Sequence, residues 1–412
     1  MCYNKNMMKK YKAAVVGGGF SGLIASERLS EAFGGENVAL FERNDRVGKK
    51  ILATGNGRGN ITNAVLSADN YHSALGADVS GIIRRYDNGS LIDYFAGLGV
   101  DVAEEEGRIY PSGFQASAVQ DMLRERISYL NTKVFLSSEV KKAEKTDGGF
   151  IISGDFGEAF AENLLLCCGG KAGAHYGTDG SAYFLSSSFG HGLTKLYPSL
   201  VQLKTETANI KGLKGIKTKA KATAIVGGKP VRSAVGDVLF TEYGISGNAA
   251  FALSPFFAGD KGGEINIEFL PEKKEEEIAS FLSEKLERLP YITEENMLTG
   301  LVNKQVGRAI TKNAGKIERS RSFADGIARA LKNFRLKVTG SLGFDYAQVT
   351  RGGVPFSEVD PATCESGKVK GLYIVGEMLD VDGDCGGYNL QWAYSSASAA
   401  CEDIIGRAYE NK

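Results

Sequence analysis

The N-terminal part of the chain alternates between apolar runs and a helical pattern. Ala13–Val16 is an unbroken apolar run, which is typical of a strand that is buried on both faces of a parallel sheet. Apolar residues then recur at helical spacing from Leu23 to Phe33, and residues 37–42 predict a second strand that ends in Glu42. The order strand, helix, strand predicts a βαβ unit.

The middle of the chain has a different pattern. Residues 200–270 alternate apolar and polar side chains between glycine turns, which predicts an antiparallel, barrel-like β domain. Residues 336–349 are expected to complete this domain. Residues 271–335 have helical spacing with charged outer faces, and they predict a small helical cap inserted into the β domain.

The C-terminal part returns to the first pattern. Residues 372–375 predict a buried strand, and a stretch of small residues after Gly386 and Gly387 predicts a helix. We therefore expect residues 1–199 and 350–412 to form one split α/β domain into which the rest of the chain is inserted.

Composition narrows the functional classes. The 412 residues suffice for two or three domains, and 53 glycines gather between the apolar runs. The 49 basic residues balance 49 acidic ones, so no overall charge would attract nucleic acid or an anionic membrane. No apolar run is long enough to span a bilayer, and the six cysteines contain no CxxC pair. We expect a cytoplasmic protein with a small-molecule substrate, no metal, no membrane span and no nucleic-acid partner.

A glycine motif lies at the end of the first predicted strand. In Gly17-x-Gly19-x-x-Gly22 the first glycine suits a tight turn, the second a close approach of the backbone to a pyrophosphate, and the third close helix packing. The helix N-terminus would face the phosphates, and Glu42 would accept a hydrogen bond from a ribose hydroxyl. The motif predicts a bound dinucleotide, which is either NAD or FAD.

The segment TGNGRGNITN, residues 54–63, favours FAD. It contains three glycines, three asparagines and one arginine, and it follows the second strand, where a cofactor would continue from its ribose towards its flavin. Its glycine backbone is expected to lie along the flavin ring, with Arg58 on the substrate side. Lys49 and Lys50 precede this segment and could meet phosphate or ribose oxygens.

Two further segments support a flavin site. A buried strand is followed by Gly169 and Gly170, as expected where the backbone again passes close to a cofactor. In the β-meander before that strand, Val140 is placed to meet the adenine through its backbone. Near the C-terminus, Gly386 and Gly387 open a helix whose N-terminus would stabilise negative charge on the pyrimidine edge of a reduced flavin.

Together these motifs resemble the YhiN-type flavoproteins, a family that includes aminoacetone oxidases and a bile-acid Δ4,6-reductase. The resemblance runs from Lys12 to about Ala400 and is carried by VVGGGFSGL, GKKILATGNGRGNITN, GRIYPSGFQASAVQDML, GTDGSAY, LFTEYGISG, TRGGVPFSEVDPATCES and GLYIVGEMLDVDGDCGGYNLQWA. It implies a two-dinucleotide-binding-type, Rossmann-like FAD domain, with FAD between the N-terminal segment and the GGYNLQ segment. The chain departs from the family at Gly59, where the family's loop often reads GRCN, and at Glu242 and Asn248, where many members carry histidine and proline.

The candidate site residues follow from these motifs and from the resemblance. The residues expected to bind the cofactor are Gly17, Gly19, Phe20, Ser21, Gly22, Glu42, Arg43, Lys49, Lys50, Thr54, Gly55, Asn56, Asn60, Val140, Gly169, Gly170, Gly376, Glu377, Asp382, Gly386, Gly387, Tyr388, Asn389 and Gln391. The catalytic candidates are Arg58, Glu242 and Tyr388, and Tyr176 and Asp382 are further acid–base candidates.

The resemblance implies an FAD-dependent oxidoreductase. NAD(P)H would be a transient electron donor, because the chain contains no second strand-GxGxxG-helix unit. The flavin would then pass hydride to an activated C=C of an enone, which in the reductase branch is a 3-oxo steroid or a bile acid. Two alternatives stay open: an amine oxidase of the aminoacetone type that releases hydrogen peroxide, and a flavin-binding regulatory protein without turnover.

Overall fold

The computed structural model describes residues 8–259, 262–312 and 317–410. Over these ranges, no helix is both long enough and apolar enough to cross a membrane. The same ranges contain no group of three or more His, Cys, Asp or Glu side chains that could hold a metal ion.

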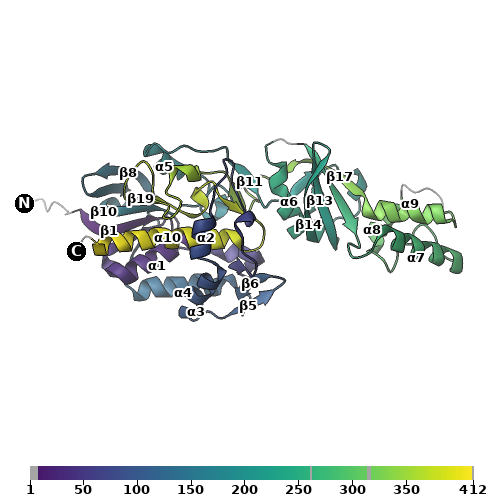
Figure 1. Ribbon diagram of the computed structural model, residues 1–412, viewed down its shortest axis with the longest axis horizontal. Coiled ribbons are helices and arrows are strands. Elements are labelled where there is room, and N and C mark those ends of the chain that lie inside the picture. The colour runs from purple at the N-terminus through teal and green to yellow at the C-terminus, as the bar shows by residue number, and fades with distance from the viewer. Residues whose placement is uncertain (1–7, 260–261, 313–316, 411–412) are drawn as a thin grey trace, which may run out of the picture. The chain divides into compact units, whose positions relative to one another are not determined.

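Contacts divide the chain into two compact units. The first consists of Met1–Tyr197 and Val349–Lys412, and the second is Pro198–Gln348. The short strands β11 (Tyr197–Ser199) and β18 (Val349–Arg351) stand at the two points where the chain passes from one unit to the other. The second unit is therefore inserted into the sequence of the first, and Figure 1 labels the elements of both.

A mixed seven-stranded sheet forms the core of the first unit. Its order is β7-β2-β1-β10-β9-β8, and β19 pairs with β10. Val16 of β1 lies opposite Phe41 of β2 and Leu166 of β10, so these parallel strands end at one edge of the sheet. All three side chains are buried, which explains the unbroken apolar runs. The strands are β1 (Lys9–Val16), β2 (Val38–Phe41), β7 (Lys133–Phe135), β8 (Val140–Thr146), β9 (Gly149–Gly154), β10 (Gly157–Leu166) and β19 (Leu372–Ile374).

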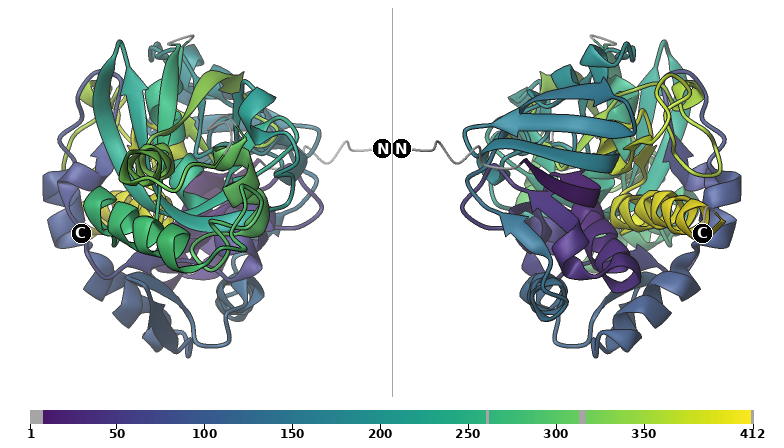
Figure 2. Two further views of the ribbon diagram at one scale, coloured as in Figure 1. Left: turned by 90° about the vertical axis from the view of Figure 1, so that its right-hand side faces the viewer. Right: turned by 90° about the vertical axis from the view of Figure 1, so that its left-hand side faces the viewer.

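Two helices from opposite ends of the chain lie side by side in the first unit. These are α1 (Phe20–Phe33) and α10 (Tyr388–Glu410), drawn in purple and yellow (Figure 1, Figure 2). Residues 395–400 of α10, the run SSASAA, are small and buried, and small side chains allow a short distance between helix axes. The other helices of this unit are α2 (Ser80–Arg85), α3 (Asn88–Gly97), α4 (Ala116–Tyr129) and α5 (Tyr183–Ser188).

Two small sheets complete the first unit. One has the strand order β3-β6-β5, and the other pairs β4 with β20. The first sheet includes the end of the glycine-rich segment. The second pairs a strand that follows this segment with a strand that precedes α10. Their strands are β3 (Thr62–Asn63), β4 (Tyr71–His72), β5 (Val102–Glu105), β6 (Arg108–Pro111) and β20 (Asp382–Gly383).

The second unit contains a closed barrel in the order β12-β15-β14-β13-β16-β17. Ala220, Ala222 and Ala224 of β13 are fully buried inside it, whereas the residues between them are partly exposed, as the alternating pattern predicts. The strands are antiparallel: β12 (Leu203–Thr205), β13 (Lys217–Val226), β14 (Lys229–Phe240), β15 (Gly244–Ser246), β16 (Gly263–Phe269) and β17 (Phe334–Ser341).

Helices lie between the last two strands of the barrel. α7 (Glu275–Arg288), α8 (Lys304–Thr311) and α9 (Arg321–Lys332) separate β16 from β17, and α6 (Asn248–Leu253) precedes them. The predicted fold class is confirmed: the chain is an α/β protein with a Rossmann-like domain, an inserted antiparallel barrel and a helical insertion.

One buried histidine ties two loops of the first unit together. His191 Nδ1 lies 2.9 Å from Glu358 Oε2, and Nε2 lies 2.7 Å from Ser366 Oγ. Glu358 Oε2 also accepts a hydrogen bond from Gly192 N at 3.0 Å. Burial lowers the pKa of His191, while the hydrogen bond and the charge of Glu358 raise it less strongly. The imidazole is therefore expected to be neutral in the folded protein.

This histidine predicts a loss of stability in mild acid. The unfolded chain binds a proton at His191 near pH 6.5, whereas the folded chain binds it only at a lower pH. The free energy of unfolding should therefore be fully present above pH ~6.5 and decrease as the pH falls from there towards the folded pKa. The single tryptophan, Trp392, is buried in the first unit, so its fluorescence in the apoprotein reports unfolding of that unit in denaturant.

The matched variant is His191→Gln, which keeps a donor and an acceptor but does not titrate. Its free energy of unfolding should change less between pH 7.5 and pH 5.5 than that of the wild type. Equal losses in the two proteins over this interval would show that His191 is not the group responsible.

Candidate functional site

The turn between β1 and α1 separates glycines that the fold needs from one that it does not. Gly17 has a φ of +102°, and a Cβ at this position would lie 2.6 Å from the carbonyl oxygen of Cys167. A Cβ on Gly22 would overlap the carbonyl oxygen of Gly17. A Cβ on Gly19, by contrast, would meet nothing within 4 Å. Gly19 therefore leaves the space in front of the N-terminus of α1 open, as a pyrophosphate requires.

Glu42 stands at the end of β2 with a fixed carboxylate. Its Oε2 accepts a hydrogen bond from Gly18 N at 2.7 Å, and its Oε1 accepts from both Asn44 N and Asn44 Nδ2 at 2.7 Å. The residue is buried, so these donors replace water. An ionised carboxylate accepts about four hydrogen bonds, and the three made here leave capacity for a ribose hydroxyl. The turn and the acid together fit a dinucleotide.

The segment after β7 lies against the same acid. Ser138 N donates to the carbonyl oxygen of Glu42 at 2.9 Å, and Ser137 N donates to that of Asn44 at 2.8 Å. Val140, the adenine candidate, is buried at the start of β8 just beyond these contacts. Arg43 instead points to Asp179 at 3.0 Å. The structure thus brings Val140 into the neighbourhood of Glu42 through backbone contacts.

Four separate segments meet around Glu377. Lys50 Nζ lies 2.8 Å from Glu377 Oε2, and Thr350 N donates to Glu377 Oε1 at 2.8 Å. The hydroxyl oxygen of Thr350 accepts a hydrogen bond from Lys171 N at 2.7 Å, and a Cβ on Gly170 would overlap that oxygen. Thr350 was not among the predicted site residues, although it is the first residue of the motif TRGGVPFSEVDPATCES.

Lys49 does not join this group. Its Nζ lies 2.6 Å from Asp45 and 3.5 Å from Asn44 Oδ1, so it faces the loop that follows β2. Both lysines that were expected to meet phosphate or ribose oxygens therefore have carboxylate partners within the protein. Only Lys50 is held by a residue from the C-terminal half of the domain.

Two side chains of the glycine- and asparagine-rich segment donate hydrogen bonds to backbone carbonyl groups in and around it. Its first part belongs to the 3₁₀ helix η2 (Lys49–Gly57). Thr54 Oγ1 donates to the carbonyl oxygen of Ile51 at 2.6 Å, and the buried amide of Asn60 donates to the carbonyl oxygens of Thr62 and Ile109 at 2.8 and 3.1 Å. These two side chains shape the loop. Gly55 and Asn56 lie within it, and Asn56 is exposed.

Arg58 packs against two neighbouring aromatic rings. Its guanidinium carbon lies 4.4 Å from the ring centre of Tyr110 and 4.5 Å from that of Phe114. Its Nη2 forms an ion pair with Glu105, and 37% of the side chain is exposed. The two ring centres are only 5.4 Å apart, so both rings contact the guanidinium from neighbouring directions, and part of the side chain remains accessible. This arrangement suits a role in positioning.

The other catalytic candidates have contacts of their own. Tyr388 is buried, and its hydroxyl donates to the carbonyl oxygen of Val65 at 3.0 Å. Glu242 belongs to the second unit, where it is exposed and forms an ion pair with Lys214, whose hydrogen bond lowers the pKa of the Glu242 carboxyl. Tyr176 lies in a 3₁₀ turn and accepts a hydrogen bond from Asn44 through its carbonyl oxygen.

The N-terminus of α10 is held by β3, the strand at the end of the glycine-rich segment. Gly387 has a φ of +100°, and a Cβ on it would overlap the carbonyl oxygen of Thr62. Asn63 Nδ2 donates to the carbonyl oxygen of Gly386 at 3.0 Å. The buried Gln391 accepts from Thr62 Oγ1 at 2.6 Å and donates to the carbonyl oxygen of Tyr86 at 2.9 Å. The first turn of α10 is thus fixed against β3.

The polar side chains around this turn have partners within the protein. Asn389 Oδ1 accepts from Gly383 N at 2.8 Å, and its Nδ2 donates to the carbonyl oxygen of the same residue at 2.9 Å. Asp382 is buried and accepts from Arg351 Nε at 3.0 Å. Asn389, Gln391 and Asp382 were expected to bind the cofactor, and the contacts seen here give their side chains a role in holding the loop.

The first turn of α1 contributes its backbone to the site. Phe20 is buried and stacks on Phe95, with ring centres 6.0 Å apart. Ser21 is also buried, and a Cβ on Gly376 would lie 3.2 Å from Ser21 Oγ. The strand-end glycine of the C-terminal segment therefore packs directly on the helix that follows the glycine motif.

The cysteines at the end of β10 are inert. Burial raises the pKa of the Cys168 thiol to about 12, and it also raises that of Cys167. Since the thiolate is the reactive form, neither cysteine is suited to redox chemistry at neutral pH.

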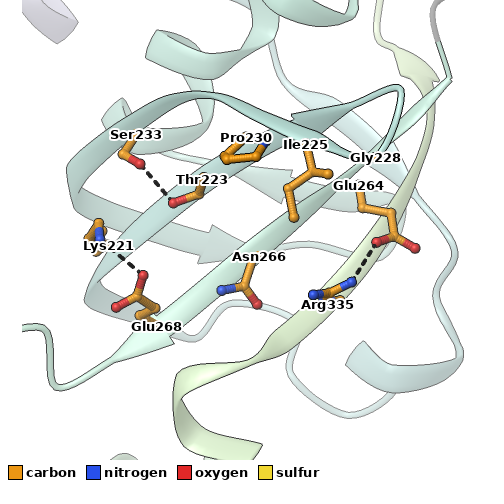
Figure 3. A pocket seen from close by; sticks show the side chains of 10 residues that line it. All are labelled: Lys221, Thr223, Ile225, Gly228, Pro230, Ser233, Glu264, Asn266, Glu268 and Arg335. Atoms are coloured by element: carbon orange, nitrogen blue, oxygen red, sulfur yellow. Dashed lines mark hydrogen bonds and ion pairs between the residues drawn. The ribbon is translucent and has the colours of Figure 1, made fainter. Parts of the chain in front are cut away.

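A separate pocket of about 460 Å³ lies on the outer face of the barrel in the second unit (Figure 3). Its charged side chains pair with each other, since Lys221 lies 3.1 Å from Glu268 and Arg335 lies 3.4 Å from Glu264. None of the predicted site residues lines it. Because its charges are neutralised and its walls carry none of the glycine motifs, we place the candidate site in the first unit.

The chain belongs to the HI0933-like family: the family model described as HI0933-like protein Rossmann domain matches residues 11–403. The 3-dehydro-bile acid Δ(4,6)-reductase of Clostridium scindens is 35% identical over 400 residues, which cover 94% of this chain and 98% of the relative. The ribosomal RNA dihydrouridine synthase of Haemophilus influenzae is 29% identical over 399 residues, covering 95% and 97%.

A solved structure of quinol–fumarate reductase with menaquinol molecules is similar in fold. It aligns with a TM-score of 0.50 at 15% sequence identity, over 98% of this chain and 72% of the reductase chain. The predicted membership of the family and an FAD-dependent oxidoreductase activity are confirmed. The expectation that nucleic acid is not a partner gains no support, because one relative is named for its action on ribosomal RNA.

The geometry of the glycine turn predicts opposite effects for two alanine variants. Gly19→Ala should leave the unfolding of the apoprotein unchanged, because its Cβ meets no protein atom, but should reduce the FAD-to-protein ratio after purification and yield nearly colourless protein. Gly22→Ala should lower the stability of the apoprotein by at least about 2 kcal/mol, because its Cβ overlaps the carbonyl oxygen of Gly17.

The two effects are measured by the absorbance of bound flavin and by Trp392 fluorescence in denaturant. A yellow Gly19→Ala variant with normal FAD content would contradict this placement of the pyrophosphate. A Gly22→Ala variant as stable as the wild type would contradict the assigned helix packing.

Proposed function

We propose that this protein reduces a carbon–carbon double bond conjugated to a carbonyl group, with NAD(P)H as the electron donor and a 3-oxo steroid or bile-acid-like enone as the substrate. The observation that carries this proposal is the 35% identity to a 3-dehydro-bile acid Δ(4,6)-reductase over nearly the whole of both chains. An identity of this extent supports a similar reaction more strongly than an identical substrate.

The names of two relatives describe related chemistry. A Δ(4,6)-reductase of a 3-dehydro bile acid acts on double bonds conjugated to a 3-keto group. Formation of dihydrouridine saturates the C5–C6 double bond of uracil, which is conjugated to the C4 carbonyl. Both reactions add two hydrogens across an activated C=C. The reaction class is therefore supported by both relatives, and the substrate class by the first.

Bound FAD would supply the hydride-transfer chemistry. The residues that fit it are the open turn at Gly19, the remaining acceptor capacity of Glu42, and the backbone around Gly386 and Gly387. Lys50 and Glu377 form an ion pair between the segments that approach the cofactor from the two halves of the domain.

We assign Arg58 a positioning role within this reaction. Its guanidinium is held by contacts with the Tyr110 and Phe114 rings and by the ion pair with Glu105, so a substrate oxygen that meets its accessible part would be fixed in direction. The Tyr388 hydroxyl donates a hydrogen bond to the carbonyl oxygen of Val65, which favours a role in holding the loop. Glu242 remains a catalytic candidate of the second unit.

We further propose that the protein acts in the cytoplasm.

Reduction of uridine in ribosomal RNA is the second candidate function. It is favoured by the similarity to the dihydrouridine synthase, which also extends over nearly the whole of both chains. The amine oxidase and the regulatory flavoprotein remain open as alternatives from the sequence motifs, and the experiment on the main proposal also tests them.

The main proposal predicts the following anaerobic result. NADH or NADPH should bleach the flavin absorbance of the purified protein, and subsequent addition of a 3-oxo-Δ4 steroid acid should restore it and yield a product heavier by two hydrogens. Mass spectrometry of the product and the absorbance near 450 nm (a general property of flavins) give the two readouts. Bleaching by aminoacetone alone, with hydrogen peroxide on admitting air, would contradict the proposal in favour of an amine oxidase. A flavin that no donor bleaches would favour the regulatory protein.

The second candidate predicts a different product. Incubation of the protein and NAD(P)H with ribosomal RNA from a strain that lacks the gene should convert a uridine to dihydrouridine, which is two mass units heavier. Nucleoside mass spectrometry detects it. RNA that stays unmodified under conditions in which the steroid enone is reduced would exclude this function.

A further inference from the structure

Arg108 is the second residue of the segment GRIYPSGFQASAVQDML, and no site role was predicted for it. It begins β6, where it lies opposite Asn63 of β3 on one side and Glu105 of β5 on the other. Its side chain is partly buried. Because β3 holds the first turn of α10, Arg108 stands one strand away from that turn.

The guanidinium of Arg108 has no partner among the residues that the structure describes: none of them forms a hydrogen bond, ion pair or ring contact with it. Glu105, which lies opposite Arg108 in β5, forms its ion pair with Arg58 instead. A partly buried cation without a counter-charge is unfavourable, since it has lost part of its hydration without compensation. An anionic partner from outside the chain would supply the missing counter-charge.

Arg108 lies next to the loop that leads into α10. A Cβ on Gly386 would lie 3.6 Å from Arg108 Nε. The positive charge of Arg108 acts on this loop: burial raises the pKa of the Cys385 thiol, Arg108 lowers it, and Asp384 raises it. Its positive charge thus acts on the same space as the N–H groups at the start of α10.

Two-electron reduction gives the ring of a flavin a negative charge. The ring takes up two electrons and one proton, so the reduced form carries one more negative charge than the oxidised form. Nicotinamide hydride supplies the electrons in the proposed function, and the negative charge is concentrated on the pyrimidine edge. A neighbouring cation stabilises the reduced form relative to the oxidised one.

We propose that Arg108 lies beside the pyrimidine edge of bound FAD and raises the reduction potential of the flavin. The inference rests on the proposed placement of FAD against the first turn of α10, and it is independent of the substrate. Glu105 lies opposite Arg108 across the β5–β6 hairpin, and its negative charge would counteract the effect of Arg108 on the flavin. The ion pair of Glu105 with Arg58 reduces this counteracting effect. The exposed Glu104 and Glu106 and the Asp384 carboxylate, which lies 2.9 Å from His72 Nε2, are the remaining acids nearby.

The test is the midpoint potential of the FAD-loaded protein, measured by equilibration with a reference dye. Arg108→Ala should favour the oxidised flavin by about tenfold, which corresponds to a potential lower by about 30 mV for a two-electron couple. Arg108→Lys should retain most of the wild-type potential. Glu105→Gln should shift the potential in the opposite direction to Arg108→Ala, because it removes a negative charge.

Lys12→Ala is the matched control for loss of one positive charge. Lys12 lies in β1 before its buried C-terminal part and forms an exposed ion pair with Glu162, so this variant should leave the potential unchanged. FAD content is measured for every variant. If Arg108→Ala loses FAD, the sign is tested by Glu105→Gln, which should raise the potential above that of the wild type.

An unchanged potential in FAD-loaded Arg108→Ala would overturn the inference, as would shifts of the same sign in Arg108→Ala and Glu105→Gln. Failure of the proposed function would look different. In that case the potentials would change as described, but the wild type would not reduce the steroid enone.

Discussion

The first unit depends on how closely the start of α1 approaches the turn at the end of β1. Gly22 lies against the carbonyl oxygen of Gly17, with no space for a Cβ between them. Because of this contact the N-terminus of α1 begins directly at the edge where the parallel strands end. α10 packs along α1 through small residues, so the direction of α10, and with it the place of its first turn, follows from the same contact. One backbone approach thus aligns two helix N-termini on a common edge.

The local parts of this arrangement could be predicted from the sequence. The β1–α1–β2 unit, the glycine motif with Glu42 and the alternating barrel strands are all written in short-range patterns. The long-range pairings could not be predicted. Gln391 and Thr62 lie far apart in the sequence, and nothing in their local patterns indicates that their side chains meet. Asn60 looked like a ligand-binding amide for the same reason, because a pattern does not tell whether an amide faces a ligand or the carbonyl groups of its own loop.

The pairing of charged residues in the site could likewise not be predicted from the sequence. Lys50 is paired with Glu377 and Arg351 with Asp382, so most charged residues near the candidate cofactor position neutralise each other and hold segments together. Such pairs cost desolvation energy and are stable only when their geometry and hydrogen bonds are good. Groups outside these pairs, such as the Glu42 carboxylate and the N–H groups of the helix N-termini, then contribute most to the electrostatic character of the site, and we propose that Arg108 is another. Sequence reasoning counts charges but does not show which of them are already compensated.

The two units differ in what their unusual residues do. Asn248 and Glu242, where the chain departs from the YhiN-type pattern, both serve local contacts in the second unit: Asn248 Oδ1 accepts from Asp237 N at 2.6 Å, and Glu242 pairs with Lys214. Neither of these two contacts involves a residue of the turn between β1 and α1. The curated relatives fit this division, because a bile-acid reductase and a ribosomal RNA dihydrouridine synthase share the full length of this chain while their names give substrates of very different size. Under the proposed function, this chain and these relatives would have in common the addition of hydrogen to an activated C=C, which needs a fixed cofactor site but no single substrate size.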